Sequence, residues 1–361
     1  MNDAMTMLPI ERAAIGLLSA ALIAAAFFWV RRSRERFHAL IATALVLTFA
    51  LVVLGAYVRL SDAGLGCPDW PGCYGDLTPH HAAEQIRAEE RSRPQGPVSL
   101  EKAWKEMIHR YVAMVVGSLI AAIAVLAWFN RRRFASSPGL ATSLVGLVAF
   151  QALLGAWTVT MLLKPAIVTS HLLGGIALLA LLAWLRLKQE VAGPGGIIAP
   201  SGLRAFAAVA FAALIAQIAL GGWVSTNHAA LACPDFPLCR GEWAPPMNFV
   251  DAFHVRRELG MSAEGQLLPM EALTAIHWMH RLGAVAAAVV LAGLGVWIAR
   301  TAGARRLGIV LLALLALQLV LGVANVVGSL PLAVAVAHNG VAALLAAWMV
   351  QVNFRLNTGL C

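Results

Sequence analysis

Long runs of apolar residues, separated by short polar stretches, dominate the chain. A helix needs about 20 apolar residues to cross the hydrocarbon of a bilayer, and nine runs approach that length. The runs are rich in alanine, leucine and valine and lack the period-two alternation of barrel strands, so they favour helices. The predicted spans are residues 13–30, 38–58, 108–129, 140–163, 168–187, 204–224, 276–299, 307–328 and 332–353.

The composition excludes an ordinary soluble domain, because 60% of the residues are hydrophobic and only 12% are charged. The net charge of +9 is not a nucleic-acid signal, because the basic residues cluster in every second loop between the spans. These loops hold Arg31, Arg32, Arg34 and Arg36, then Arg131 to Arg133, Arg186 and Lys188, Arg300, Arg305 and Arg306, and Arg355. All of them therefore fall on one face of the membrane.

The positive-inside rule makes this basic face cytoplasmic. Nine spans then put the N-terminus outside and the C-terminus inside, with two long loops, about 59–106 and 225–275, on the outer face. Four of the five cysteines lie in these loops, where an oxidising compartment permits disulfides. We expect a multi-pass protein of a bacterial-type inner membrane with periplasmic cysteine loops, and Cys361 as a free cytoplasmic thiol.

The chain contains an internal duplication. Twelve positions separate Gly55 from Cys67, and twelve separate Gly221 from Cys233, each glycine closing a span and each cysteine opening a Cys-Pro-Asp-aromatic-Pro-x-Cys element. Further along, His109-Arg110 matches His280-Arg281, and Gln151 precedes His171 by the same 20 positions as Gln318 precedes His338. Each repeat therefore holds four helices, and an even number makes the repeats parallel.

We therefore predict an all-α integral membrane protein of two tandem, pseudo-symmetric four-helix bundles, which together supply eight core spans. The span at 13–30 is additional, and the Arg-rich stretch behind it favours a retained helix over a signal peptide. The predicted parts are 1–36, this helix and a basic cytoplasmic loop; 37–190, the N-terminal bundle; 191–202, a cytoplasmic linker rich in glycine and proline; and 203–361, the C-terminal bundle.

Four histidines, His109, His171, His280 and His338, begin descending helices at matching repeat positions. A histidine inside a membrane helix is costly and needs a partner. Haem iron accepts two axial imidazoles, and bundle cores are a usual place for such a site. We predict that His109 pairs with His171, and His280 with His338, around two haems. The alternatives are buried structural histidines or zinc, which prefers closer ligand spacing.

Small residues near these histidines leave room for a flat macrocycle, or serve only helix packing. They are Gly117, Gly174, Gly175 and Gly340. Arg110 and Arg281 each follow a predicted ligand by one residue. A guanidinium pairs well with a haem propionate, although an arginine at this depth could also only snorkel to the interface.

Glu106 precedes His109 by three residues, which on a helix is about 60° around the axis and about 4.5 Å along it. The matching residue of the second half is His277, read as structural rather than as a ligand. The two sites are therefore unequal, and we expect the first to be reactive and the second to hold a standing cofactor. Glu106 would accept a proton or stabilise a developing cation; the plainer reading is a carboxylate favoured by the helix dipole.

The cysteines form two closely spaced pairs, Cys67 with Cys73 and Cys233 with Cys239. A disulfide within each loop is the simple interpretation, each worth about 2 kcal/mol against the unfolded loop. Redox exchange with a partner is the alternative function, and four cysteines allow three connectivities.

At these motifs the chain resembles the haem A synthase family, over residues 38 to 353. The elements that carry the resemblance are Gly64-Leu-Gly-Cys-Pro-Asp-Trp-Pro71, Glu106-x-x-His-Arg110, Ser170-His171, Ala275-Ile-His-Trp-Met-His-Arg281 and Ala337-His338. The resemblance implies oxidation of the C8 methyl of haem O to the formyl of haem A by successive hydroxylations. It assigns the essential glutamate to Glu106, the ligands to the four histidines, haem B to the C-terminal half and the haem O substrate to the N-terminal half.

The implied context is terminal oxidase assembly, with haem O synthase and oxidase assembly factors as candidate partners and an electron acceptor that the sequence does not identify. Membrane lipid surrounds the chain, no nucleic acid is expected, and a homo-oligomer is left open. Two other function classes remain as alternatives: a dihaem b-type, quinol-linked electron carrier and a haem transporter or chaperone. Neither would change the haem A content of a cell.

Overall fold

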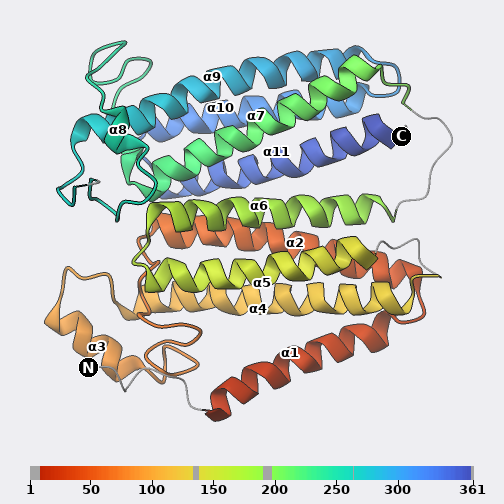
Figure 1. Cartoon of the computed structure of the whole chain (residues 1–361), viewed down its shortest axis with the longest axis horizontal. Coiled ribbons are helices and arrows are strands. Elements are labelled where there is room, and N and C mark those ends of the chain that lie inside the picture. Colours follow the sequence, from red (N-terminus) through yellow and green to blue (C-terminus); the bar gives the residue numbers. More distant parts are fainter. Residues whose placement is uncertain (1–8, 133–137, 190–196, 263, 359–361) are drawn as a thin grey trace. The chain divides into compact units, whose positions relative to one another are not determined.

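The computed structural model describes residues 9–132, 138–189, 197–262 and 264–358. Within these residues the fold is helical, nine helices are long and apolar enough to cross a membrane, and β-structure is confined to three isolated bridges (Figure 1). The spanning helices are α1 (Pro9–Val30), α2 (Arg34–Leu60), α4 (Leu100–Phe129), α5 (Pro138–Thr160), α6 (Pro165–Leu187), α7 (Ser201–Thr226), α9 (Met270–Arg300), α10 (Arg305–Val327) and α11 (Leu332–Thr358). The predicted all-α, multi-pass fold with an additional first helix is confirmed.

Two of the spanning helices begin well before their apolar runs. Helix α4 starts at Leu100, behind an N-cap at Ser99 whose hydroxyl accepts from the backbone N–H of Lys102 at 3.2 Å. Helix α9 starts at Met270, directly after Pro269. These first turns, which carry Glu101 and Glu271, lie outside the predicted spans, which begin at 108 and 276. They place Glu106 and His277 within continuous helix, one turn ahead of His109 and His280.

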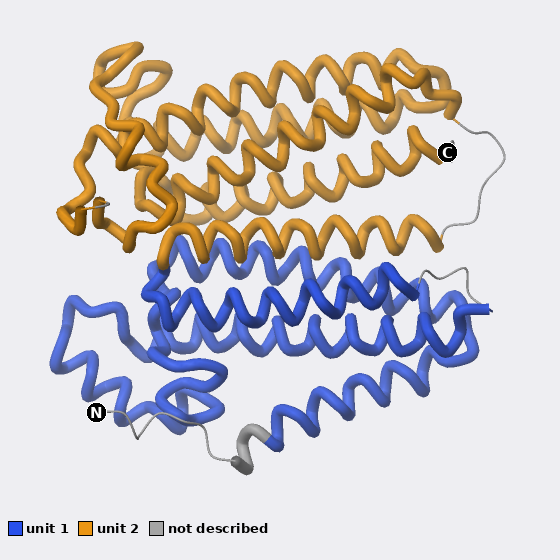
Figure 2. The backbone as a smooth tube through the Cα atoms, in the orientation of Figure 1, with its two compact units in different colours: residues 1–163 blue, residues 164–361 orange. Residues whose placement is uncertain are grey.

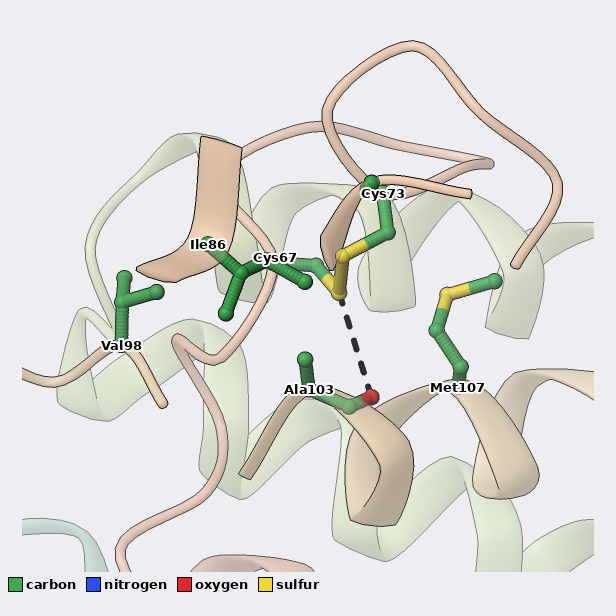
Figure 3. Close-up of a cluster of buried hydrophobic side chains, with 7 residues drawn as sticks. Cys67, Cys73, Ile86, Val98, Ala103 and Met107 are labelled. Carbon is green, nitrogen blue, oxygen red and sulfur yellow. Dashed lines mark hydrogen bonds between the residues drawn. A yellow bond between two sulfur atoms is a disulfide. The ribbon is translucent and has the colours of Figure 1, made fainter. Parts of the chain in front are cut away.

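Three short helices lie in the long loops, α3 (Ala83–Ser92), the 3₁₀ helix η1 (Ala229–Leu231) and α8 (Phe249–Ala252). Helix α3 belongs to the loop between α2 and α4, and its Ile86 is fully buried with Val98 against Ala103 and Met107 of α4. Figure 3 shows the Cys67–Cys73 disulfide in the same cluster, above the first turns of α4. The loop is thus packed onto the helix that carries Glu106.

The chain divides into two compact units, residues 1–163 and 164–361 (Figure 2). In unit 1, α4 packs against α1, α2 and α5. In unit 2, α7 and α10 each pack against both α9 and α11, so that α9 and α11 lie on a diagonal of the bundle. Helix α6 packs against α7 and α11.

The unit boundary falls before α6, whereas the duplication assigns α6 to the first repeat. The predicted repeat boundaries at 37–190 and 203–361 therefore stay a prediction, as does the orientation of the basic face. Residues 191–196 of the predicted linker, together with Arg133 and Cys361, lie outside the described residues.

Candidate functional site

Glu106 lies buried near the N-terminal end of α4, with 5% of its surface exposed. One carboxylate oxygen accepts from the backbone N–H of Cys67 at 2.9 Å. The other pairs with the guanidinium of Arg110, one turn further along the same helix, at 2.5 Å. A buried carboxylate is stable only when it is paired and hydrogen-bonded, and both conditions are met here. The structure therefore brings together Glu106, Arg110 and the cysteine loop.

Arg110 also donates hydrogen bonds to the cysteine loop, residues 67–73, which the Cys67–Cys73 disulfide closes. Its Nη1 donates to the carbonyl of Asp69 at 2.8 Å and to those of Pro71 and Gly72. The carboxylate of Asp69 in turn accepts from the backbone N–H groups of Tyr74 and Gly75. The guanidinium is therefore engaged by protein groups, and its predicted role toward a haem propionate stays a prediction.

Close approach between the loop and α4 requires a glycine at position 66. A Cβ on Gly66 would lie 2.6 Å from the backbone nitrogen of Ala103 and 2.7 Å from the carbonyl oxygen of Lys102. Such distances are sterically forbidden, so any side chain would push the loop away from the helix. The adjacent N–H of Cys67 reaches Glu106 only because this approach is allowed.

Unit 2 repeats the arrangement with His277 in the place of Glu106. His277 is buried, its Nδ1 lies 3.3 Å from the backbone nitrogen of Cys233, and its Nε2 lies 3.3 Å from Nε of Arg281. A neutral imidazole accepts only one hydrogen bond, so at most one of these contacts is a hydrogen bond. Arg281 donates to the carbonyls of Cys233, Asp235 and Leu238 at 2.7–2.8 Å. The two units thus share a clamp, an arginine that donates to three loop carbonyls, which is Arg110 in unit 1 and Arg281 in unit 2. They differ at the residue one turn earlier on the helix, which is Glu106 or His277.

Each cysteine loop is closed by its own disulfide, Cys67–Cys73 in unit 1 and Cys233–Cys239 in unit 2. The structure therefore shows the intra-loop pairing, out of the three connectivities that the sequence allows. Both loops also end in the same two-hydrogen-bond bridge, Cys73 with Asp76 and Cys239 with Glu242. Whether either disulfide exchanges with a partner stays a prediction.

The carboxylate of Asp235 stabilises its loop in a pH-dependent way. The backbone N–H of Gly241, and then that of Arg240, donate to it and lower the pKa of Asp235 below its usual value. A depressed carboxylate pKa contributes stability that is present above the unfolded value and is lost as pH falls through the folded value. We expect the exchange protection of the Arg240 and Gly241 amides to fall below pH about 4, as measured by hydrogen exchange.

The control for this prediction is Asp235→Asn, because an amide oxygen still accepts a hydrogen bond but does not titrate in this range. Protection of the Arg240 and Gly241 amides in that variant is expected to be weaker than in the parent. It should also be independent of pH between roughly 3 and 6, a range that extends about one to two units around the usual aspartate pKa. An unchanged acid response in the variant would assign the effect to another group.

Three of the four predicted ligand histidines lie against a glycine of a neighbouring helix. A Cβ on Gly55 of α2 would lie 3.1 Å from Cε1 of His109. The corresponding distance is 3.1 Å from Gly221 of α7 to His280, and 3.2 Å from Gly322 of α10 to His338. These glycines accommodate the imidazole rings, whereas a Cβ on Gly117, predicted to border the macrocycle, would only touch Val148 at 3.9 Å.

In unit 2 the structure brings His280 and His338 together. They project from the diagonal helices α9 and α11 and are close enough to interact electrostatically. Gln217 of α7 places its amide nitrogen 3.0 Å from Nδ1 of His280, and Gln318 of α10 lies 3.2 Å from Nε2 of His338. His109 belongs to unit 1 and His171 to unit 2, so their pairing stays a prediction.

These residues fit a haem between α9 and α11. Nδ1 of His338 is buried without a hydrogen-bond partner among the described residues, and iron or a second-sphere acceptor would satisfy the ring. An imidazole that binds iron through Nε2 donates its Nδ1–H to a partner. The amide of Gln217 lies beside Nδ1 of His280, and its oxygen would accept this hydrogen bond with the amide turned over. No cluster of three or more His, Cys, Asp or Glu residues suited to a metal ion occurs in the part of the chain that the structure describes. The donor set available is therefore a pair of imidazoles.

Filling the glycine beside His280 should weaken that site. In Gly221→Ala the new Cβ meets the ring at 3.1 Å, and moving the ring off its rotamer costs about 1 kcal/mol. We expect haem affinity to fall roughly five- to tenfold, measured by titrating the purified protein with haem. Gly202→Ala, also on α7, is the control because its Cβ would lie 3.7 Å from Trp297, an ordinary contact. Equal affinities for both variants would contradict this role for Gly221.

Sequence reasoning missed several residues at these sites. Gly55 and Gly221 were visible as matched positions of the duplication, but nothing in the sequence indicated that they face histidines. Gln217 had no such signal, because Leu51 occupies the matching position of the first repeat. Arg257, a buried cation of the second long loop, was also missed.

Comparison with known proteins finds similarity along most of the chain. A family model described as cytochrome oxidase assembly protein, COX15-CtaA, matches residues 38–350. A heme A synthase of Shewanella oneidensis is 42% identical over 322 residues, which cover 88% of this chain and 96% of that protein. Heme A synthases of Halalkalibacterium halodurans and Hyphomonas neptunium are 27% and 28% identical, over 70% and 91% of this chain and 78% and 93% of their own lengths.

Proposed function

The chain belongs to the COX15-CtaA family of cytochrome oxidase assembly proteins, and from that premise we propose that it is a haem A synthase. It is an oxidoreductase that converts the C8 methyl of haem O to a formyl group by successive hydroxylations. The observation that carries the proposal is the family match along residues 38–350, which includes Glu106 and all four predicted ligand histidines. The resemblance seen in the sequence alone pointed to the same activity.

The two halves have different roles in this proposal. Substrate haem O would be held in the N-terminal site by His109 and His171, and haem B would be held in the C-terminal site by His280 and His338. Support for this division comes from the clamp, which holds a carboxylate, Glu106, in unit 1 and an imidazole, His277, in unit 2. Bound haem B would supply one-electron transfer.

Glu106 acts on the methyl-bearing edge of the substrate. Each hydroxylation replaces a C–H bond of the methyl group with a C–OH bond; with water as the oxygen source it releases two protons and passes two electrons to the electron acceptor. The second product, a geminal diol, loses water to leave the formyl group. Glu106 accepts a proton or stabilises positive charge that develops at this edge. Both roles need a carboxylate held in a fixed place, and Arg110 supplies a positive charge beside it. Arg110 and the N–H of Cys67 fix the orientation of the carboxylate.

The proposed setting is the inner membrane, with the cysteine loops and N-terminus in the periplasm and the C-terminus in the cytoplasm. Haem O synthase would supply the substrate and oxidase assembly factors would receive the product. These partners are carried over from the resemblance, whereas the oligomeric state is left open.

Extraction of haems from a host that makes haem O but no haem A tests the function. Expression of this chain is expected to produce haem A, identified by chromatography and mass of the extracted pigment. A dihaem electron carrier or a haem transporter would leave the extract with haem O and haem B alone. That result, obtained with correctly inserted and haem-loaded protein, would refute the proposal.

A further inference from the structure

Arg257 is a buried cation whose hydrogen-bonding capacity is only partly used. It lies between α8 and α9, and 3% of its surface is exposed. Nη2 donates to Oδ1 of Asn227 at 2.6 Å, and the guanidinium lies 5.7 Å from the ring centroid of Trp223. Nε and Nη1 are buried without a hydrogen-bond partner among the described residues. Arginine stays protonated in proteins, so this is a buried positive charge with open donors.

No protein carboxylate neutralises this charge within the described residues. Asp251 is close enough to interact electrostatically, but its carboxylate accepts from Nδ2 of Asn248 at 2.6 Å. The adjacent Glu258 pairs with Lys164. Leaving buried guanidinium donors unsatisfied is costly, and an anion beside Nε and Nη1 would satisfy the donors and neutralise the charge together.

The position of Arg257 relates it to the histidine pair of unit 2. Its partners Trp223 and Asn227 close helix α7, the helix whose Gly221 lies on the ring of His280. Six residues separate 221 from 227, which is about 9 Å along a helix. Because Arg257 contacts Asn227, it lies beyond the histidines, near the C-terminal end of α7. The loop between α7 and α9 covers this end of the bundle (Figure 1). Arg281, a further arginine near this end, already donates to three loop carbonyls.

We propose that Arg257 binds a carboxylate of a porphyrin, namely a propionate of the haem held by His280 and His338. This inference rests on the proposed function only in requiring a haem in the second site. A haem carries its propionates on one edge, and charged groups are driven out of the hydrocarbon toward the ends of the helices. A guanidinium recognises a carboxylate through charge-assisted hydrogen bonds. Trp223 and Asn227 hold the guanidinium at this end of α7 for that contact.

The test compares haem B with its dimethyl ester, which has the same ring but no carboxylates. The protein is the purified full-length chain with His109 and His171 replaced by alanine, so that only the second site can bind. Titration is followed by the absorbance of the bis-imidazole complex. Arg257→Gln is expected to weaken haem B binding about tenfold or more and to leave binding of the ester unchanged. Arg256→Gln, which removes an exposed neighbouring charge, should change neither affinity.

Two results would overturn the proposal. If Arg257→Gln weakens the binding of haem B and of the ester equally, Arg257 supports the fold rather than a propionate. If Arg257→Gln binds haem B as tightly as its parent does, the buried cation pairs with another anion, such as a lipid phosphate. If Arg257→Gln does not fold, Arg257→Lys serves, with the ester again insensitive to the change. Absence of any bis-imidazole spectrum in the parent would instead count against the proposed haem site itself.

Discussion

Replacing Glu106 with glutamine is expected to abolish haem A formation while leaving haem binding close to normal. The amide keeps the shape of the side chain and can still accept from the N–H of Cys67, but it cannot take a proton or neutralise a developing cation. General acid–base groups contribute about 10²- to 10⁴-fold to rates, so the haem A yield should fall by at least 100-fold. Haem extraction measures the yield, and the absorbance spectrum of the purified protein measures bound haem.

Glu101→Gln is the matched control for this experiment. Glu101 lies five residues earlier on α4, is exposed, and pairs only with Lys105 of the same helix. It should retain full activity. Glu106→His, which copies the second unit into the first, should be as inactive as Glu106→Gln. Haem A at the parental level in Glu106→Gln would remove Glu106 from the mechanism, whatever its structural role.

Replacing Arg110 with glutamine is expected to destabilise unit 1 severely. The change leaves the carboxylate of Glu106 buried with one backbone donor and removes hydrogen bonds to three carbonyls of the cysteine loop. Breaking a buried ion pair by removing one partner costs about 3–5 kcal/mol. Thermal unfolding of the detergent-solubilised protein, followed by far-UV circular dichroism, measures the loss.

Arg281→Gln provides the comparison within the same molecule. Arg281 holds the same three-carbonyl clamp, but its helix partner is the imidazole of His277 rather than a carboxylate. Its removal leaves no buried carboxylate behind, so the loss of stability should be smaller than for Arg110→Gln. The double variant Glu106→Gln with Arg110→Gln should recover part of the loss, because no unpaired charge remains. Equal losses in the two single variants would contradict the charge argument. A fall in haem affinity without a fall in stability would favour a propionate role for Arg110.

The hydrophobic pattern was enough to predict the nine spanning helices of the described chain, including the additional first helix. This is because the length of an apolar run and its flanking charges are local properties of a sequence inserted in a bilayer. The pattern placed the starts of α4 and α9 six to eight residues too late, because their first turns carry charged residues and pack against the long loops.

The duplication likewise identified Glu106 and His277 as matching residues, since equal spacing between motifs is visible in one dimension. It did not reveal that each of them contacts the first cysteine of its own loop, about forty residues away. In both units that contact depends on the folded loop and on the reach of the arginine one helical turn further on. In unit 1 it also depends on the room left by Gly66, whose matching residue in unit 2 is Ala232.

Residue types and repeat spacing therefore indicated which groups carry the chemistry: four histidines, one glutamate and two cysteine pairs. The folded structure alone decided what surrounds them: glycines that receive the rings of His280 and His338, loop carbonyls that engage Arg281, and the burial of Arg257 with open donors. The physical reason is that burial and hydrogen-bond partners arise from segments distant in sequence, whose approach is set by packing rather than by any local pattern.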